Sequence, residues 1–145
     1  MATVFDVAKY ILEQRGEITA MKLQKLVYYS QAWHLVWDEE PLFPERIEAW
    51  ANGPVVPDLY AEHKRFYTVD ASSLTHGSSK NLTEGQVGSI DAVLSLYGDK
   101  KSQWLSELTH MEDPWKNARV GIPMGERGNR EITHADMADY YSSLL

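Results

Sequence analysis

The chain has 145 residues, of which 43 % are hydrophobic, enough for one domain that buries about two-thirds of its unfolded surface. Its formal net charge of −7 argues against a protein that binds nucleic-acid backbones, because such proteins normally carry a basic face. Cysteine is absent, which excludes disulfides, thiolate nucleophiles and cysteine metal sites.

The N-terminal segment predicts a first helix. Thr3 followed by Asp6 is a variant of the capping box, and Gly16 is expected to end the helix. Charged residues interrupt every apolar run of residues 1–17, so we expect neither a signal peptide nor a membrane span. The protein is therefore expected to be soluble and cytoplasmic, with no membrane partner.

Residues 21–37 carry apolar side chains at three- and four-residue steps, the spacing of one buried helical face. Thr19 is expected to cap this helix through its hydroxyl. A helix of this length, with Trp33 on its buried face, is expected to form the core of the domain. Lys22 and Lys25 lie off the apolar face and are expected to point into water.

The pattern changes after this helix. Pro41 is expected to end it, because proline disfavours helical geometry in the residue before it. Residues 46–50 alternate between apolar and polar or aromatic side chains, which predicts a short strand with two dissimilar faces. Residues 52–54 (Asn-Gly-Pro) predict a turn, and Pro57 is expected in the first turn of another helix.

The second half of the chain predicts a loop, further helices and a second strand. Residues 68–80 are rich in serine, threonine and glycine, which indicates a surface loop. Helices are expected to begin near Thr83, Ser102 and Thr133, each of which can cap a helix. Residues 130–133 are expected to form a second short strand.

No repeat or composition shift divides the chain, so we expect residues 1–145 to form one domain. The predicted fold class is mainly α: a compact single-domain helical bundle of five to six helices with a minimal two-stranded β element. Its strands are residues 46–50 and 130–133, since each is short and has no other strand with which to pair.

A doubled Glu-x-x-His pattern is the sharpest catalytic-looking feature: Glu107 with His110, and Glu131 with His134. In helical bundles two such motifs and two further glutamates hold a di-iron centre. Thr133, the expected helix cap, separates Glu131 from His134, so we expect no metal site and no cofactor. A metal-dependent enzyme that uses these four residues is kept as an alternative.

Other catalytic patterns are missing from the sequence. There is no Gly-x-Ser-x-Gly elbow, and the serines cluster in the predicted loop. The glycine-rich residues 121–129 follow no strand and open no helix where a phosphate-binding loop would. We therefore expect no catalytic residues and no enzyme activity.

Aromatic residues lie beside turn formers at two places, where Trp50 precedes residues 52–54 and Trp115 follows Pro114. Large, stiff side chains of this kind are favoured anchors of protein interfaces. A rigid loop also lowers the ordering cost of binding. The expected partner-binding residues are Trp50, Gly53, Pro54, Val55, Tyr60 and Trp115. The alternative is that both tryptophans plug the ends of the bundle.

Three segments, residues 23–34, 41–50 and 53–60, resemble the SocA-like antitoxin family, also called the Panacea domain. A further block resembles the family's C-terminal signature and comprises Thr109-His110, Pro114-Trp115 and Ala118-Arg119. The resemblance implies a non-enzymatic antitoxin, commonly encoded beside a toxin gene in bacteria or their phages. Such a protein neutralises its toxin by direct protein binding.

The implied partner is a cognate protein toxin. Some family members act as adaptors that present the toxin to a protease, so a protease or its unfoldase is a second candidate partner. No nucleic-acid partner is expected. A phage-encoded regulator that binds host factors is kept as an alternative function. The sequence leaves open the identity of the toxin, the oligomeric state, and the choice between blockade and delivery to a protease.

Overall fold

The computed structural model describes residues 2–145, which form seven α-helices and two small antiparallel sheets. The helices are α1 (Val4–Arg15), α2 (Ala20–Asp38), α3 (Pro57–His63), α4 (Glu84–Tyr97), α5 (Ser102–Met111), α6 (Asp113–Ala118) and α7 (His134–Ser142). The strands are β1 (Ile18–Thr19), β2 (Ile47–Trp50), β3 (Gly53–Val55), β4 (Thr68–Val69) and β5 (Glu131–Ile132). The predicted mainly α fold class is confirmed.

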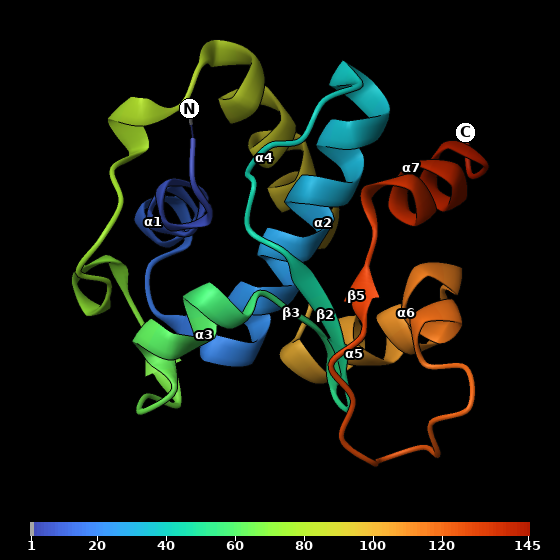
Figure 1. Cartoon of the computed structure of the whole chain (residues 1–145). Helices are drawn as coiled ribbons and strands as arrows, with labels where there is room; N and C mark the ends of the chain where they lie inside the picture. The colour runs from blue at the N-terminus through green and yellow to red at the C-terminus, as the bar shows by residue number, and fades with distance from the viewer. Residues whose placement is uncertain (1) are drawn as a thin grey trace.

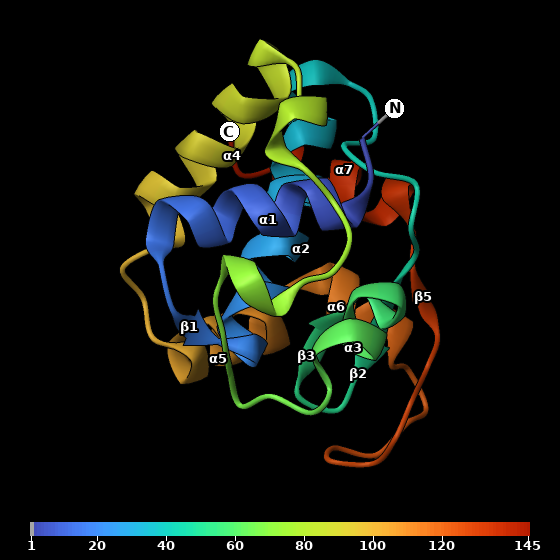
Figure 2. The same ribbon diagram turned by 90° about the vertical axis from the view of Figure 1, so that its left-hand side faces the viewer.

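Helix α2 is the central element of the molecule. Helices α1, α4, α5 and α7 contact it from different sides, so most of its length is covered (Figures 1 and 2). Thr19 caps it as predicted, because its hydroxyl accepts a hydrogen bond from the backbone N–H of Lys22 at 3.1 Å. Trp33 is buried, as the spacing predicted.

The expectation that Lys25 points into water is wrong. Its side chain is fully buried, and its ammonium nitrogen lies 3.4 Å from the carbonyl oxygen of Pro54. The reason is that α2 is covered all round, so a position off the apolar face meets other protein rather than solvent. Lys22, one turn earlier, is partly exposed.

Strand β2 is the middle strand of a three-stranded sheet in the order β3-β2-β5. Its pairing with β5 confirms the predicted contact between residues 46–50 and 130–133. The sheet is larger than the two strands expected, because Gly53–Val55 forms β3 instead of part of a turn. The turn falls one position earlier, at Ala51 and Asn52.

The helix count also exceeds the predicted five to six. Pro114 lies in the first turn of a separate helix, α6, where its missing N–H has no partner to lose. One residue with extended backbone, Glu112, separates this short helix from the end of α5. Pro114 was expected to break the chain after α5, and in the structure it lies in the first turn of the next helix.

Residues 68–80, predicted to be a surface loop, are anchored to α1. Strand β4 pairs with β1, and two short 3₁₀ turns follow, η1 (Ala71–Ser73) and η2 (Ser79–Asn81). The carboxylate of Asp6 accepts hydrogen bonds from the backbone N–H of Ser78 at 2.8 Å and the side-chain amide of Asn81 at 3.1 Å. Within residues 2–145, no helix has the length and apolar content needed to cross a bilayer.

A buried carboxylate joins three helical regions. Glu112, between α5 and α6, accepts hydrogen bonds from the hydroxyls of Tyr29 on α2 and Tyr141 on α7, both at 2.7 Å. All three residues are at most 5 % exposed. These two hydrogen bonds compensate part of the cost of burying the carboxylate of Glu112.

Candidate functional site

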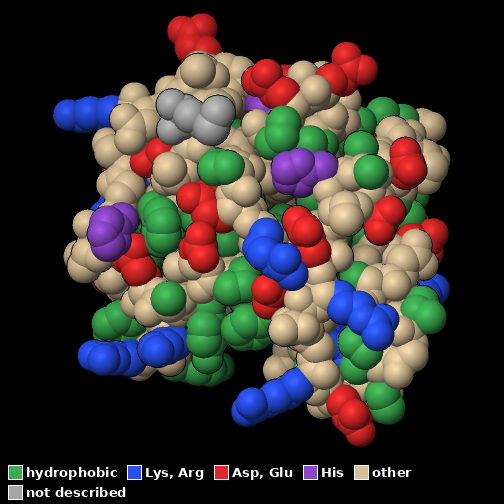
Figure 3. Space-filling view, in the orientation of Figure 1, with side chains coloured by type: hydrophobic (Ala, Val, Ile, Leu, Met, Phe, Trp, Pro, Cys, Tyr) green, Lys and Arg blue, Asp and Glu red, His purple; other side chains and the backbone are tan. Residues whose placement is uncertain are grey.

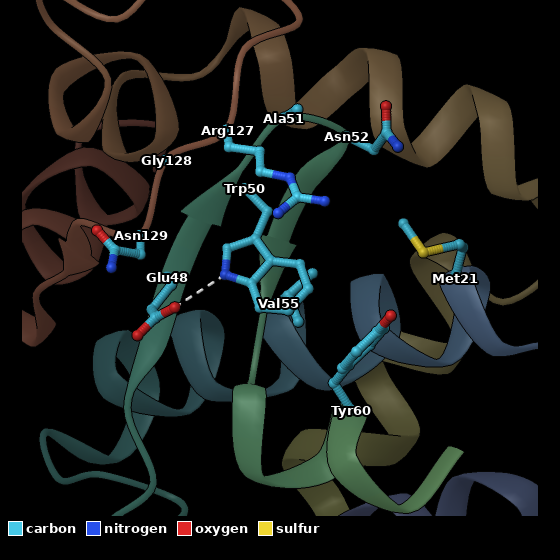
Figure 4. Close-up of a pocket in the computed structure, with 10 residues that line it drawn as sticks. All are labelled: Met21, Glu48, Trp50, Ala51, Asn52, Val55, Tyr60, Arg127, Gly128 and Asn129. Carbon is cyan, nitrogen blue, oxygen red and sulfur yellow. Dashed lines mark hydrogen bonds between the residues drawn. The ribbon is translucent and has the colours of Figure 1, made fainter. Parts of the chain in front are cut away.

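A pocket of about 740 Å³ opens beside the β2–β3 hairpin (Figure 4). Its walls come from the hairpin, the start of α2, the helix α3 and the loop that leads into β5. The lining residues are Met21, Glu48, Trp50, Ala51, Asn52, Val55, Tyr60, Arg127, Gly128 and Asn129.

The alternation of β2 decides which of its side chains reach the pocket. Ile47 and Ala49 are buried, whereas Glu48 and Trp50 are partly exposed and line the pocket. This is the two-faced strand that the sequence predicted. Val55 lies opposite Glu48 on β3 and contributes to the same face.

Trp50 is held in place on two sides. Its indole N–H donates to the carboxylate of Glu48 at 2.8 Å, drawn as a dashed line in Figure 4. Its ring meets that of Tyr60 on α3 edge to face, with centroids 4.9 Å apart. Hairpin and helix thus present a fixed, partly exposed aromatic pair.

The charges of the pocket are unequal. Glu48 is compensated, because its carboxylate also pairs with the guanidinium of Arg46 at 3.0 Å. Arg127 forms no ion pair or side-chain hydrogen bond with any residue in 2–145. In Figure 4 its guanidinium extends from the loop toward the space beside Trp50. The uncompensated charge at this pocket is therefore positive.

Two buried side chains support the hairpin from behind. The indole N–H of Trp115 donates to the carbonyl oxygen of Trp50 at 2.8 Å. The guanidinium of Arg119 donates to the carbonyl oxygen of Ala49 at 3.0 Å and to that of Glu126 in the loop. Arg119 is 5 % exposed, so one buried cation holds both the hairpin and the loop that form the pocket.

The six residues predicted to bind a partner divide into two groups. Trp50, Val55 and Tyr60 line the pocket. Gly53, Pro54 and Trp115 are buried at the hairpin and behind it, and Trp115 is only 3 % exposed. Trp115 is therefore buried, as the alternative predicted for both tryptophans, whereas Trp50 is partly exposed.

Comparison with protein families identifies the chain. The family model described as "Antitoxin SocA-like, Panacea domain" matches residues 23–116, more than half of the sequence. The chain belongs to this antitoxin family. Searches of curated proteins and of solved structures gave no match.

The family match covers only part of the pocket. It begins in α2 and ends in α6, so it includes the hairpin, Tyr60 and the buried Trp115. Met21 and the loop residues Arg127–Asn129 lie outside it. The sequence did not single out these loop residues. Of the glycines in the run 121–129, Gly128 is the one that lies close to other side chains, since an added Cβ there would be 3.0 Å from Nη1 of Arg119.

A cluster of basic side chains lies behind the hairpin of this Panacea domain. Burial lowers the pKa of Lys25 to about 7. Burial, together with the charge of Lys25, also lowers the pKa values of His63 and His110. His110 stacks on Trp115 with centroids 4.1 Å apart, and its buried Nε2 has no hydrogen-bond partner among the described residues.

The two Glu-x-x-His motifs do not form a shared site. Glu107 is exposed on α5, where it accepts a hydrogen bond from Gln103, and His110 of the same motif packs on Trp115. Glu131 lies on β5, and His134 is an exposed residue at the start of α7. Across residues 2–145, no three histidine or acidic side chains lie close enough to hold a metal ion.

Proposed function

We propose that the protein is the antitoxin of a toxin–antitoxin pair and that it neutralises a cognate protein toxin by direct, stoichiometric binding in the cytoplasm. The observation that carries this proposal is membership of the SocA-like antitoxin family, which implies a cognate toxin as partner. Antitoxins of this family are generally not enzymes, so binding is the expected mode of action.

The pocket beside the hairpin is the proposed contact surface. Trp50 and Tyr60 are partly exposed, and their mutual packing fixes both rings before a partner arrives. Preorganised aromatic side chains make favourable interface anchors, because little side-chain entropy is lost when they are covered. Gly53 and Pro54 contribute by fixing the hairpin, and Val55 contributes part of the pocket wall.

Neutralisation can proceed by blocking the toxin or by delivering it to a protease or its unfoldase. These two mechanisms predict different amounts of toxin in the cell. Blockade leaves the toxin level unchanged and gives a stable complex. Delivery lowers the toxin level, and the loss depends on the protease.

The proposal is tested by co-expression. Each product of the genes adjacent to this one is expressed alone and then together with the protein. One of them is expected to arrest growth alone, to be neutralised on co-expression and to co-purify with the protein. Immunoblots of the toxin then separate blockade from delivery. The proposal is wrong if no adjacent gene product is toxic and none binds.

A further inference from the structure

We infer that the pocket binds an acidic peptide segment with apolar side chains, presented by the partner protein. This inference rests on the proposed function for the statement that the partner is a protein. The chemistry of the segment comes from the charges and apolar surfaces that face the pocket.

The first charge argument comes from the loop side. Arg127 is exposed, lines the pocket and has no ion pair or side-chain hydrogen bond within residues 2–145. The acidic lining residue, Glu48, is already paired with Arg46 and with the indole of Trp50. An incoming carboxylate would therefore meet an unpaired cation and little opposing charge.

The second charge argument comes from the α3 side. Lys64 follows Tyr60 by four residues, and its backbone N–H donates to the carbonyl oxygen of Tyr60 at 2.9 Å. Side chains four residues apart lie on the same face of a helix, so Lys64 extends from the Tyr60 side of α3. Lys64 and the next residue, Arg65, are both exposed.

Cations therefore flank the pocket on both sides. In Figure 3 the lower edge of the molecule is indented between the α3 side and the loop, with Lys and Arg side chains on either side. The chain as a whole has a net charge of −7, whereas the unpaired charge among the residues that line the pocket is positive. Such an arrangement steers and orients an acidic partner segment.

The pocket interior is suited to apolar side chains. Met21 and Val55 contribute aliphatic surface, and the rings of Trp50 and Tyr60 form an adjoining wall. Its volume of about 740 Å³ is within the range of sites that enclose a compact ligand. One or more apolar side chains could be buried there while flanking carboxylates contact the rim.

A peptide fits these observations better than a nucleic acid does. Binding of single strands relies on aromatic faces on which bases stack. Here the rings of Trp50 and Tyr60 are inclined by 66° and contact each other, so they do not form a stacking platform. The net charge of −7 also opposes a phosphate backbone.

The test uses synthetic peptides and does not require the toxin. The probe is a short peptide in which leucines are flanked by glutamates, and the comparison peptide has lysine in place of each glutamate. Both are titrated into the ¹⁵N-labelled protein at low salt. The indole N–H signal of Trp50, identified with the Trp50→Phe variant, reports binding at the pocket.

We expect the acidic peptide to shift the Trp50 signal and the basic peptide to leave it unchanged. Arg127→Glu should weaken binding of the acidic peptide by about fivefold or more, because an attractive charge becomes a repulsive one. The same variant should gain measurable binding of the basic peptide. Lys80→Glu is the matched control, since Lys80 is an exposed cation on η2, beside α1, and its replacement changes the net charge equally.

Three results would overturn the inference. Equal binding of the two peptides would show that charge does not select the segment. An equal loss with Lys80→Glu and Arg127→Glu would show that the charge of the pocket is not involved. A thymidine oligonucleotide that shifts the Trp50 signal more strongly than the acidic peptide would assign the site to nucleic acid. Because the titration contains no toxin, these outcomes do not bear on the proposed function, which the co-expression experiment tests separately.

Discussion

Lys25 lies in the core, where the carbonyl oxygen of Pro54, at 3.4 Å, is the one acceptor for its ammonium among residues 2–145. Burial disfavours the charged ammonium and lowers its pKa from 10.5 to about 7. Between these two values the unfolded chain binds more protons than the folded chain. The stability of the protein should therefore rise with pH from about 7 to about 10 through this residue.

Replacement of Lys25 by methionine tests this linkage. Lys25→Met keeps a long, flexible side chain and removes the charge. The free energy of unfolding of this variant at pH 6 should therefore exceed that of the parent by a few kcal/mol. The advantage should shrink as the pH rises toward 10, where the native lysine is neutral in the folded protein. Denaturant unfolding of both proteins across this range measures the difference. A difference that does not change with pH would contradict the assigned pKa.

Trp115 was expected to contact a partner, but in the structure it is a buried residue behind the hairpin. It is 3 % exposed and donates to the carbonyl oxygen of Trp50 at 2.8 Å. Trp115→Ala should reduce the free energy of unfolding by about 3–5 kcal/mol, as buried aromatic truncations do. Trp115→Phe, which retains most of the packing but not the N–H donor, should cost less. Thermal unfolding compares them, and equal melting temperatures for Trp115→Ala and the parent would show that this packing is unimportant.

At the scale of elements, the β2–β3 hairpin depends on a glycine. Gly53 has a φ of +123°, and a Cβ atom there would lie 2.5 Å from Cε of Lys25. The backbone geometry therefore requires glycine, and an added Cβ would also force the end of the Lys25 side chain to move.

Gly53→Ala should accordingly destabilise the protein by about 1–3 kcal/mol and disturb the pocket. Gly88→Ala is the matched control, because Gly88 is exposed within helix α4 and nothing lies within 4 Å of its added Cβ. That control should be neutral or stabilise by up to about 1 kcal/mol. Chemical denaturation measures both. Equal effects at the two positions would refute the requirement for glycine in the hairpin.

Several elements could be predicted from sequence because their signals are local. The spacing of α2, the cap at Thr19 and the alternation of β2 all appear in the structure. Strand β3 was missed, because Asn-Gly-Pro is a strong turn signal and proline is rare in strands. The burial of Lys25 and the position of Arg127 at the pocket were missed for another reason. They depend on which elements meet in space, and one helical or loop pattern does not contain that information.

At the scale of the whole molecule, α2 is the core and the pocket lies where its first turn, the hairpin, α3 and the loop before β5 meet. Buried groups hold these elements together from behind, among them Arg119, which contacts both hairpin and loop. The pocket is thus a property of the assembled fold. Substitutions of its exposed residues should change binding more than stability.

The affinity of the purified protein for its co-purified toxin tests the central claim most directly. Isothermal titration compares the parent with Trp50→Ala in the pocket and with Trp104→Ala on α5, where Trp104 is 45 % exposed and does not line the pocket. The account predicts that Trp50→Ala weakens binding by about thirtyfold, as loss of an aromatic interface anchor does, whereas Trp104→Ala binds like the parent. Unchanged affinity of Trp50→Ala, or no binding of a toxin by the parent, would contradict it.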